Sequence, residues 1–387
     1  MNLLFLTTTL PRKKRTGSEQ LSQCFIDALE HSGHSVWVLG YQRKAKRFPE
    51  TDREVTIDER HIETSNAGLY PLLWMARGVL SNLPYSSAKY VSKAYGQAVQ
   101  QALQARSYDA VIIDHAQLGW LARFIPPALP VVLLTHNVEH ELYTAQLSDR
   151  NAVAKWVYGR EAALIERVQT EVVNRVREVW TLTAYDTAYF SGIKPIGVRG
   201  FKIPYSMQAA PLTCEKTYDI GILGSWTWKA NLAGLRWFVE AVYPLLPKHV
   251  SIRVAGAGAD WLANQYPNLE YCGFVPDPRV FLSEAKAVAI PSVSGSGIQI
   301  KTLEAIALGA PIVATCVALR GITDYPESIQ LADAPADFAA ALLERIATPM
   351  ASTLQTDAIA WSEQRYDQFV AEVNTAIESL TGRCLVG

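Results

Sequence analysis

Residues 294–314 read SGSGIQIKTLEAIALGAPIVA, and this stretch decides the fold. A loop of small residues is followed by a helical pattern, a Gly-Ala-Pro turn and an apolar strand, while residues 287–291 predict the strand that enters the loop. Ser and Gly let backbone N–H groups approach an anion closely, and the first turn of a helix carries partial positive charge. Lys301 stands in that turn and Glu304 follows three residues later. The stretch therefore predicts an anion site, and we expect a nucleotide diphosphate there.

Outward from this stretch, strand and helix patterns alternate along both halves of the chain. Such alternation predicts α/β architecture with doubly wound parallel sheets. Residues 41–66 are polar and predict an irregular excursion. The expected strands are 2–8, 35–39, 110–113, 131–134, 179–183, 219–223, 250–255 and 269–273, and the expected helices are 19–31, 67–105 (broken near Pro84), 153–176, 184–190, 232–245, 280–285, 334–346 and 357–380.

The length of 387 residues predicts two domains, since one ordinary core rarely grows so large. Residues 204–213 lack periodicity and contain prolines, so they are the expected linker. The predicted domains are then 1–203 and 214–360, followed by a final helix at 361–387.

Charge and cysteine usage exclude several classes of protein. A formal net charge of -1 argues against a general nucleic-acid binder. The five cysteines are scattered without a CxxC pair, which favours a reducing compartment and gives no zinc pattern. The N-terminus lacks a signal-peptide pattern, and residues 68–80 are too short to span a bilayer. We therefore expect a cytoplasmic protein, whose basic runs at 12–15 and 43–47 are solvated surface or contact the inner face of a membrane.

Three nucleotide-binding patterns are absent. Gly256 and Gly258 begin a dinucleotide fingerprint, but Trp261 stands where the third glycine belongs. There is no Asp-x-Asp to hold a divalent metal on a diphosphate, and no P-loop. We therefore expect no metal and no bound cofactor.

Histidine and charged candidates each have a structural alternative. His136 ends an apolar strand, where it caps the strand locally or faces a ligand cleft. Glu304 either complements the helix dipole or accepts hydrogen bonds from a ribose diol. Lys301 is either a solvated lysine or the partner of an anion, and its place against the helix dipole favours the anion.

Three segments together resemble the retaining glycosyltransferases of family 4. They are residues 224–238 (GSWTWKANLAGLRWF), 254–276 (VAGAGADWLANQYPNLEYCGFVP) and 297–314 (GIQIKTLEAIALGAPIVA). The resemblance implies a GT-B fold, in which two Rossmann-like domains face a central cleft and a C-terminal helix returns to the N-terminal domain. It also implies transfer of a sugar, expected to be glucose, from a UDP-sugar to a saccharide or lipid-linked acceptor in polysaccharide biosynthesis. The sub-branch resembles bacterial and cyanobacterial exopolysaccharide transferases.

The resemblance also implies roles for individual residues. Glu304 matches the second glutamate of the family's E-x7-E motif, which binds the donor ribose, and His136 matches a histidine that contacts the donor sugar. Phe274 and Val275 match the segment that holds the nucleobase, and Gly17 matches a loop near the donor phosphates. The expected acceptor side lies around Gly17 and His136, with Trp74 or Tyr85 as a further contact.

Two departures from the family pattern leave alternatives open. Ser296 replaces the first glutamate, and residues 225–229 show no obvious Arg and Lys pair, so Lys301, with Lys229, is the expected diphosphate partner. A UDP-sugar epimerase or a non-catalytic UDP-sugar-binding subunit is therefore an alternative to the transferase. The predicted catalytic residues are His136 and Lys301, and the predicted donor contacts are Gly17, Ser225, Lys229, Phe274, Val275, Ser296, Gly297, Ile298, Lys301 and Glu304.

Overall fold

The computed structural model describes residues 1–14, 16–44, 47–62, 70–144, 152–205, 214–295 and 297–382. The chain divides into two compact units: unit 1 comprises Met1–Phe201 and Phe369–Gly387, and unit 2 comprises Lys202–Gln368. These boundaries differ from the expected ones because the last helix, α12 (Ser352–Thr381), is continuous and contributes its first part to unit 2. Of the expected linker, residues 206–213 lie outside the described residues.

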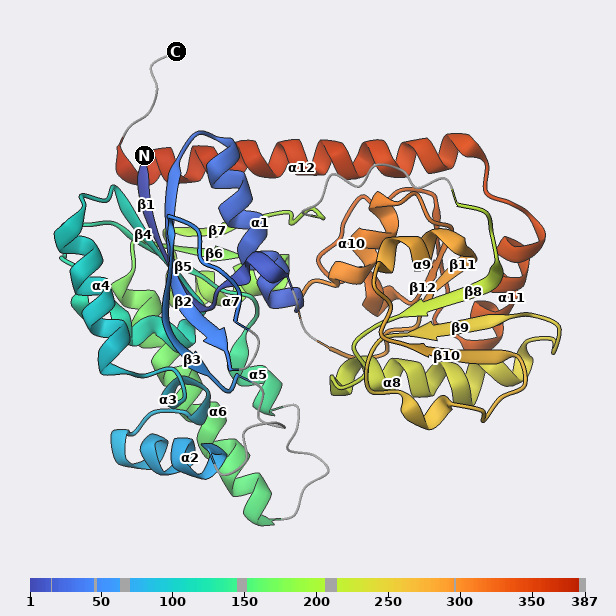
Figure 1. Cartoon of the computed structure of the whole chain (residues 1–387), viewed down its shortest axis with the longest axis horizontal. Helices are drawn as coiled ribbons and strands as arrows, with labels where there is room; N and C mark the ends of the chain where they lie inside the picture. The colour runs from blue at the N-terminus through green and yellow to red at the C-terminus, as the bar shows by residue number, and fades with distance from the viewer. Residues whose placement is uncertain are drawn as a thin grey trace. The chain divides into compact units, whose positions relative to one another are not determined.

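Unit 1 is built on a parallel sheet with the strand order β3-β2-β1-β4-β5-β6-β7 (Figure 1). Its strands are β1 (Asn2–Thr9), β2 (Ser35–Arg43), β3 (Glu54–Arg60), β4 (Ala110–Asp114), β5 (Val131–Leu134), β6 (Glu178–Thr181) and β7 (Val198–Gly200). The order reverses between β1 and β4, so the connections after these two strands diverge there. Open α/β sheets bind ligands at such a switch point, outside the carboxyl ends of the strands.

Helices cover both faces of the unit 1 sheet. They are α1 (Gly17–His31), α2 (Tyr70–Ser81), α3 (Tyr85–Ala88), α4 (Lys93–Ala105), α5 (Glu139–Thr144), α6 (Ala152–Arg175) and α7 (Ala184–Ile193), with 3-10 turns at Pro11–Lys13 and Ala116–Phe124. In Figure 1, α1 and α4 lie on opposite sides of the strands. Leu4 and Leu6 of β1 join the core that contains Tyr95 and Val99 of α4, as the alternation of side chains along a strand requires.

Unit 2 repeats this plan with the strand order β10-β9-β8-β11-β12-β13, again all parallel. Its strands are β8 (Tyr218–Leu223), β9 (Ile252–Ala255), β10 (Leu269–Gly273), β11 (Ala285–Ile290), β12 (Ile312–Ala314) and β13 (Ile329–Leu331). Its helices are α8 (Lys229–Trp237), α9 (Pro278–Glu284), α10 (Ile300–Ala307), α11 (Pro335–Ala347) and the first part of α12, with short turns at Phe238–Val242, Tyr243–Leu245, Asp260–Leu262 and Cys316–Leu319. The switch point lies between β8 and β11.

The paired glycines of the incomplete dinucleotide fingerprint have a packing role in unit 2. Gly256 and Gly258 follow β9 with φ values of 110° and 98°, which other residues rarely adopt. A Cβ atom on Gly256 would lie 1.7 Å from the carbonyl oxygen of Gly224, in the loop after β8. The two glycines therefore let the loops after β8 and β9 approach each other.

Three strands were missed in the sequence. Residues 41–66 contain β3, whereas we expected an irregular excursion there, and no strand was expected at β7 or β13. β3 lies at the edge of the sheet, is rich in polar residues and mixes exposed with half-buried positions, so it shows no apolar run. β7 and β13 are three-residue strands at edges, too short to show a period. The helix expected at 232–245 begins earlier, at Lys229, and gives way to π and 3-10 turns after Trp237.

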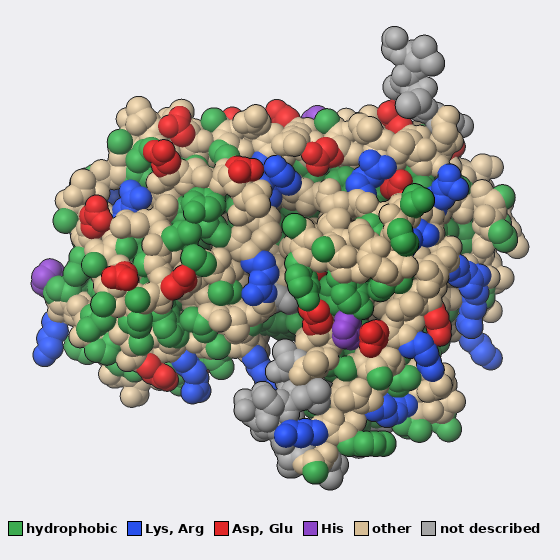
Figure 2. All heavy atoms as spheres, turned by 180° about the vertical axis from the view of Figure 1, so that it is seen from behind, with side chains coloured by type: hydrophobic (Ala, Val, Ile, Leu, Met, Phe, Trp, Pro, Cys, Tyr) green, Lys and Arg blue, Asp and Glu red, His purple; other side chains and the backbone are tan. Residues whose placement is uncertain are grey.

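The distribution of charged side chains tests the expectation that the basic runs contact a membrane. Charged side chains of both signs are interspersed on the face that Figure 2 shows. Arg43 is buried in an ion pair with Glu19, and Arg12 pairs with Glu54. Arg43 is therefore not presented to a lipid head group, contrary to one expectation for the basic runs. Among the helices that the structure describes, none is both long and apolar enough to cross a bilayer.

Candidate functional site

The unit 2 site begins with the turn that leads into α10. Gly297 has a φ of 72°, a left-handed conformation suited to glycine, and Gln299 caps the helix without a side-chain hydrogen bond. The helix starts at Ile300, so Gly297 and Ile298 precede it, and Lys301 lies in its first turn. The start of a helix presents backbone N–H groups and the positive end of the helix dipole, and both favour an anion.

Lys301 extends from α10 to the switch point of the unit 2 sheet. It lines a pocket of about 190 Å³, with its solvent-open part included, together with Leu223 of β8, Leu282 of α9 and residues 288–290 of β11. Its Nζ atom donates a hydrogen bond to Oδ1 of Asn231 at 3.4 Å. Burial lowers the pKa of the Lys301 ammonium to about 8. A half-buried ammonium whose one hydrogen bond to a described residue is long and goes to a neutral group is suited to an external anion.

Glu304 lies one turn further along α10 and is buried. Its Oε1 atom accepts a hydrogen bond from the hydroxyl of Tyr205 at 2.8 Å. Burial raises the pKa of the Glu304 carboxyl, the Tyr205 hydroxyl opposes that shift, and the charges of Asp277 and Arg279 act in opposite directions. Tyr205 therefore holds one oxygen of the carboxylate in place.

Four of the other predicted donor contacts lie along the same edge of the unit 2 sheet, whereas Gly17 lies in unit 1. Ser225 and Lys229 are exposed in and after the loop that follows β8. Phe274 follows β10 and is 82% exposed, and Val275 is partly buried. Ser296 lies outside the described residues.

Asn231 links two of these segments, and nothing in the sequence singled it out. Its Nδ2 atom donates to the carbonyl oxygen of Ser225 at 3.1 Å, while its Oδ1 atom accepts from Lys301. This amide therefore ties the loop after β8 to the first turn of α10.

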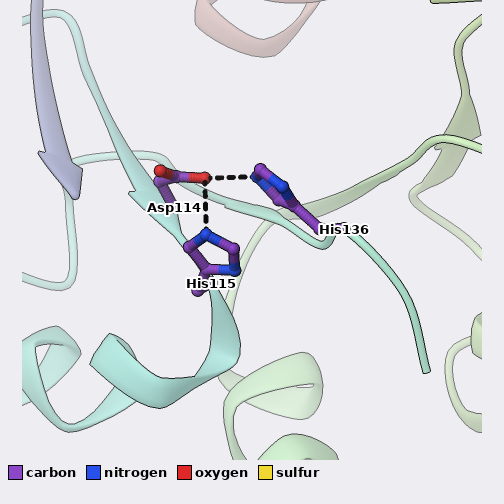
Figure 3. Close-up of side chains that lie close together, drawn as sticks. All are labelled: Asp114, His115 and His136. Atoms are coloured by element: carbon purple, nitrogen blue, oxygen red, sulfur yellow. Dashed lines mark hydrogen bonds and ion pairs between the residues drawn. The ribbon is translucent and has the colours of Figure 1, made fainter. Parts of the chain in front are cut away.

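A second polar cluster lies at the switch point of unit 1, and Figure 3 shows three of its members. Asp114, the last residue of β4, is fully buried, and its Oδ1 atom lies 2.8 Å from Nε2 of His136. Its Oδ2 atom accepts hydrogen bonds of 2.7 Å from the hydroxyls of Thr7 on β1 and Ser22 on α1. His136 is thus oriented by a buried carboxylate, which the sequence alone did not indicate.

His115 completes this cluster. Its ring stacks on that of His136, with centroids 3.9 Å apart, and its Nε2 atom lies 3.9 Å from Oδ1 of Asp114. Oγ of Ser18 lies 2.9 Å from Nε2 of His115 and 3.4 Å from Nδ1 of His136. We define the unit 1 cluster as Thr7, Ser18, Ser22, Asp114, His115 and His136.

Burial and charge shift the titration of this cluster. For Asp114, burial alone would raise the pKa, but the two neighbouring histidines and its hydrogen bonds prevail and lower the pKa to about 2. Burial lowers the pKa of His115 to about 3, and the His136 charge adds to that shift. At neutral pH the cluster therefore holds an ionised aspartate beside an uncharged His115.

Of the residues expected on the acceptor side, Gly17 and Trp74 lie in different settings. Gly17 is exposed and begins α1, next to Ser18 of the unit 1 cluster. Trp74 is buried and its ring packs against that of Tyr85, with centroids 5.8 Å apart. A buried indole has no surface for an acceptor, so the expectation for Trp74 was wrong.

Fold and sites together define a class of protein. Two parallel α/β units each carry polar groups at the switch point of their sheet, as nucleotide- and sugar-binding α/β proteins do. In unit 2, the helix end with Lys301 suits a phosphate group and Glu304 suits a diol. The class that the structure defines is therefore that of α/β proteins with two Rossmann-like units.

Comparison with known protein families gives a match for one part of the chain. Residues 217–348 match the family model described as "Glycosyl transferases group 1". That range contains Lys301, Glu304 and every strand of unit 2. No curated protein matches the sequence of the chain.

Solved glycosyltransferase structures share the fold at low sequence identity. Sucrose-phosphate synthase from Thermosynechococcus elongatus superposes with a TM-score of 0.68 at 13% identity, over 99% of this chain and 100% of that one. Anabaena HepE in complex with UDP and glucose gives 0.62 at 15%, over 99% and 100%, and the lipopolysaccharide glycosyltransferase WaaG gives 0.61 at 15%, over 98% and 100%. The expected GT-B fold, with two parallel-sheet Rossmann-like domains, is confirmed.

Proposed function

We propose that this protein is a retaining glycosyltransferase that moves a sugar from a UDP-sugar to a saccharide or lipid-linked acceptor. One observation carries the proposal. A half-buried lysine and a buried glutamate lie three residues apart on α10, within the segment that matches the group 1 glycosyltransferase model. This pair offers a cation to a diphosphate and a carboxylate to a ribose diol.

The nucleotide would occupy the carboxyl edge of the unit 2 sheet. Glu304 accepts hydrogen bonds from the ribose hydroxyls through the oxygen that Tyr205 leaves available, and the base lies against Phe274 and Val275. Lys301 and the backbone N–H groups of Gly297 and Ile298 face the diphosphate. Because these groups already supply positive charge, the diphosphate needs no metal ion.

The transfer exchanges one bond at the anomeric carbon of the donor sugar. The bond from this carbon to the diphosphate oxygen breaks, and the acceptor hydroxyl oxygen forms the new bond on the same face. The leaving phosphate oxygen takes the acceptor proton. Lys301 and the start of α10 stabilise the charge that develops on the diphosphate, and His136 contacts the transferred sugar.

The choice of donor and acceptor draws on the similar structures. HepE is described in complex with UDP and glucose, and WaaG is involved in lipopolysaccharide biosynthesis. We therefore propose UDP-glucose as donor and a growing surface polysaccharide as acceptor, of the exopolysaccharide or heterocyst-envelope kind. The reaction then takes place in the cytoplasm, at the inner face of the membrane.

A screen for UDP release tests the proposal. Purified protein is incubated with UDP-glucose and other nucleotide sugars, with and without oligosaccharide acceptors, and products are separated by chromatography. We expect UDP and a lengthened acceptor, with nucleotide binding weakened about tenfold or more in Glu304→Ala. The exposed Glu240→Ala is the matched control and should behave as wild type.

Two other outcomes would replace the proposal. A new UDP-sugar formed without acceptor would identify an epimerase. UDP binding with no turnover on any acceptor would identify a non-catalytic subunit, and unchanged transfer in Glu304→Ala would remove Glu304 from the site.

A further inference from the structure

The unit 1 cluster brings together one ligand atom from each of three side chains that commonly bind metals. Oδ1 of Asp114 and one ring nitrogen each of His115 and His136 lie within 4.8 Å of one another. Nε2 of His136 is 2.8 Å and Nε2 of His115 is 3.9 Å from that same oxygen, so both rings aim at one point (Figure 3). Ligands of a tetrahedral zinc ion at its usual bond lengths are about 3.3 Å apart, between these two distances.

The backbone of His115 adds an independent observation. Neighbouring residues of an extended strand point to opposite faces, so Asp114 and His115 would normally diverge. His115 instead has φ 76° and ψ 135°, a conformation close to a region that is essentially restricted to glycine and costs other residues about 1–3 kcal/mol. This conformation accompanies the convergence of the two side chains, and a glycine would adopt it at lower cost. The presence of histidine at position 115, despite this cost, is therefore an argument that its imidazole has a role.

A ring of hydroxyl groups surrounds the three ligand atoms. The hydroxyls of Thr7 and Ser22 hold Oδ2 of Asp114, which leaves Oδ1 for the centre of the cluster. Ser18 lies beside both histidines. Hydrogen bonds that fix a ligating carboxylate in this way are a regular feature of metal sites.

We propose that Asp114, His115 and His136 form a binding site for a divalent transition-metal ion of the zinc class. Two imidazoles and one carboxylate are ligands that zinc takes at about 2.0–2.2 Å, with a fourth position for water or the Ser18 hydroxyl. The ion would replace the hydrogen bond between Asp114 and His136, and Nδ1 of His136 would keep its place beside Ser18. All three ligands belong to unit 1, and metal binding is measured without donor or acceptor, so a failure of this proposal and a failure of the proposed transfer can be told apart.

Metal binding to the full chain, stripped with a chelator, tests the proposal directly. Zn²⁺ is titrated by isothermal calorimetry, and Co²⁺ is used as a spectroscopic probe whose d–d absorption reports nitrogen and oxygen ligands. We expect one ion per chain, and at least a tenfold loss of affinity in Asp114→Asn, His136→Ala and His115→Gly. The exposed His249→Ala and Cys316→Ser are controls for binding to the surface and should keep wild-type affinity.

The variant His115→Gly separates loss of a metal ligand from loss of folding. It removes the imidazole and also the backbone strain at this position, so we expect it to stay folded. Its thermal unfolding temperature in the absence of metal should equal or exceed that of the wild type. Zinc should then raise the unfolding temperature of the wild type but not that of His115→Gly. No stoichiometric binding by the wild type, or equal affinity in a folded His115→Gly, would overturn the proposal.

Discussion

The two switch points of the molecule are built alike and charged differently. In unit 1, the carboxylate of Asp114 receives hydrogen bonds from Thr7, Ser22 and His136, so side chains of the protein stabilise its negative charge. In unit 2, the ammonium of Lys301 has one hydrogen bond within the described part of the chain, of 3.4 Å and to a neutral amide. The same topology thus places a satisfied anion in one unit and an under-compensated cation in the other.

This difference indicates where an external anion binds. No carboxylate of the described residues pairs with the half-buried ammonium of Lys301, and its lowered pKa is consistent with a cost in free energy of folding. A bound diphosphate would remove the cost by supplying the missing charge. Unit 2 is therefore the expected anion-binding unit.

The largest effect should come from removing the cation of unit 2. In Lys301→Met we expect transfer to fall by about 100-fold or more, because the developing charge of the leaving diphosphate loses its partner. The same change should stabilise the ligand-free protein by roughly 2–3 kcal/mol at pH 7, because a buried charge is removed. UDP release and calorimetric unfolding measure the two effects.

The pH dependence of the stabilisation by Lys301→Met tests whether it comes from removing the charge of the ammonium. With a folded pKa of about 8 and an ordinary value of 10.5, Lys301 binds its proton more weakly in the folded state, so the wild type gains stability as pH rises between these values. The advantage of Lys301→Met should therefore be full below pH 8 and fade toward pH 10.5. The exposed Lys248→Ala is the matched control, and a similar loss of transfer in it would contradict a specific role for Lys301.

Acid should act mainly on unit 1. His115 titrates at about 3 when folded and at 6.5 ordinarily, so the unfolded chain binds an extra proton between these values and stability falls as pH falls through that window. Asp114, at about 2 against 3.8, contributes stability that is present above pH 3.8 and is lost as pH falls toward 2. From pH 6.5 to 4.5 we expect the His115 contribution to be roughly 2–3 kcal/mol.

Urea unfolding of the wild type and His115→Gly across this pH range checks the prediction. The free energy of unfolding of the variant should decline less between pH 6.5 and 4.5. Parallel curves for the two proteins would mean that His115 does not carry the acid sensitivity.

The smallest effect should come from Tyr205→Phe, which removes the hydroxyl that orients Glu304. We expect the affinity for UDP to fall about three- to tenfold, less than in Glu304→Ala, because the carboxylate stays but loses one restraint. Calorimetric titration of UDP measures it. Tyr266→Phe, a partly buried tyrosine elsewhere in unit 2, is the control, and an effect of Tyr205→Phe as large as that of Glu304→Ala would assign Tyr205 a direct contact with the nucleotide.

How far the sequence could predict the fold depended on the strength of each local pattern. Inner strands such as β1 and β8 show apolar runs because both faces are buried, and amphipathic helices such as α1 show a clear period. Edge strands gave no such signal, because one side of β3 is solvated and β13 has only three residues. These edge segments therefore form strands because they pair with a neighbouring strand, and not because of their local sequence preference.

Within the candidate sites, local sequence was enough for α10. The small-residue loop, Lys301 and Glu304 are neighbours in the chain, so their geometry follows from one helix start. Asp114 and His115 lie at the end of β4 and His136 lies after β5, and only the parallel pairing of these two strands brings the histidine to the other two residues. Tyr205 reaches Glu304 across 99 positions of sequence in the same way.

By itself, then, the sequence determined two parallel α/β units and an anion-binding helix start, because both depend on short-range periodicity and backbone chemistry. Only the tertiary structure decided which charges have partners. The ionised Asp114 receives hydrogen bonds from groups on β1, on α1 and after β5, whereas Lys301 has one amide partner among the described residues. Which partners a charge receives depends on long-range packing.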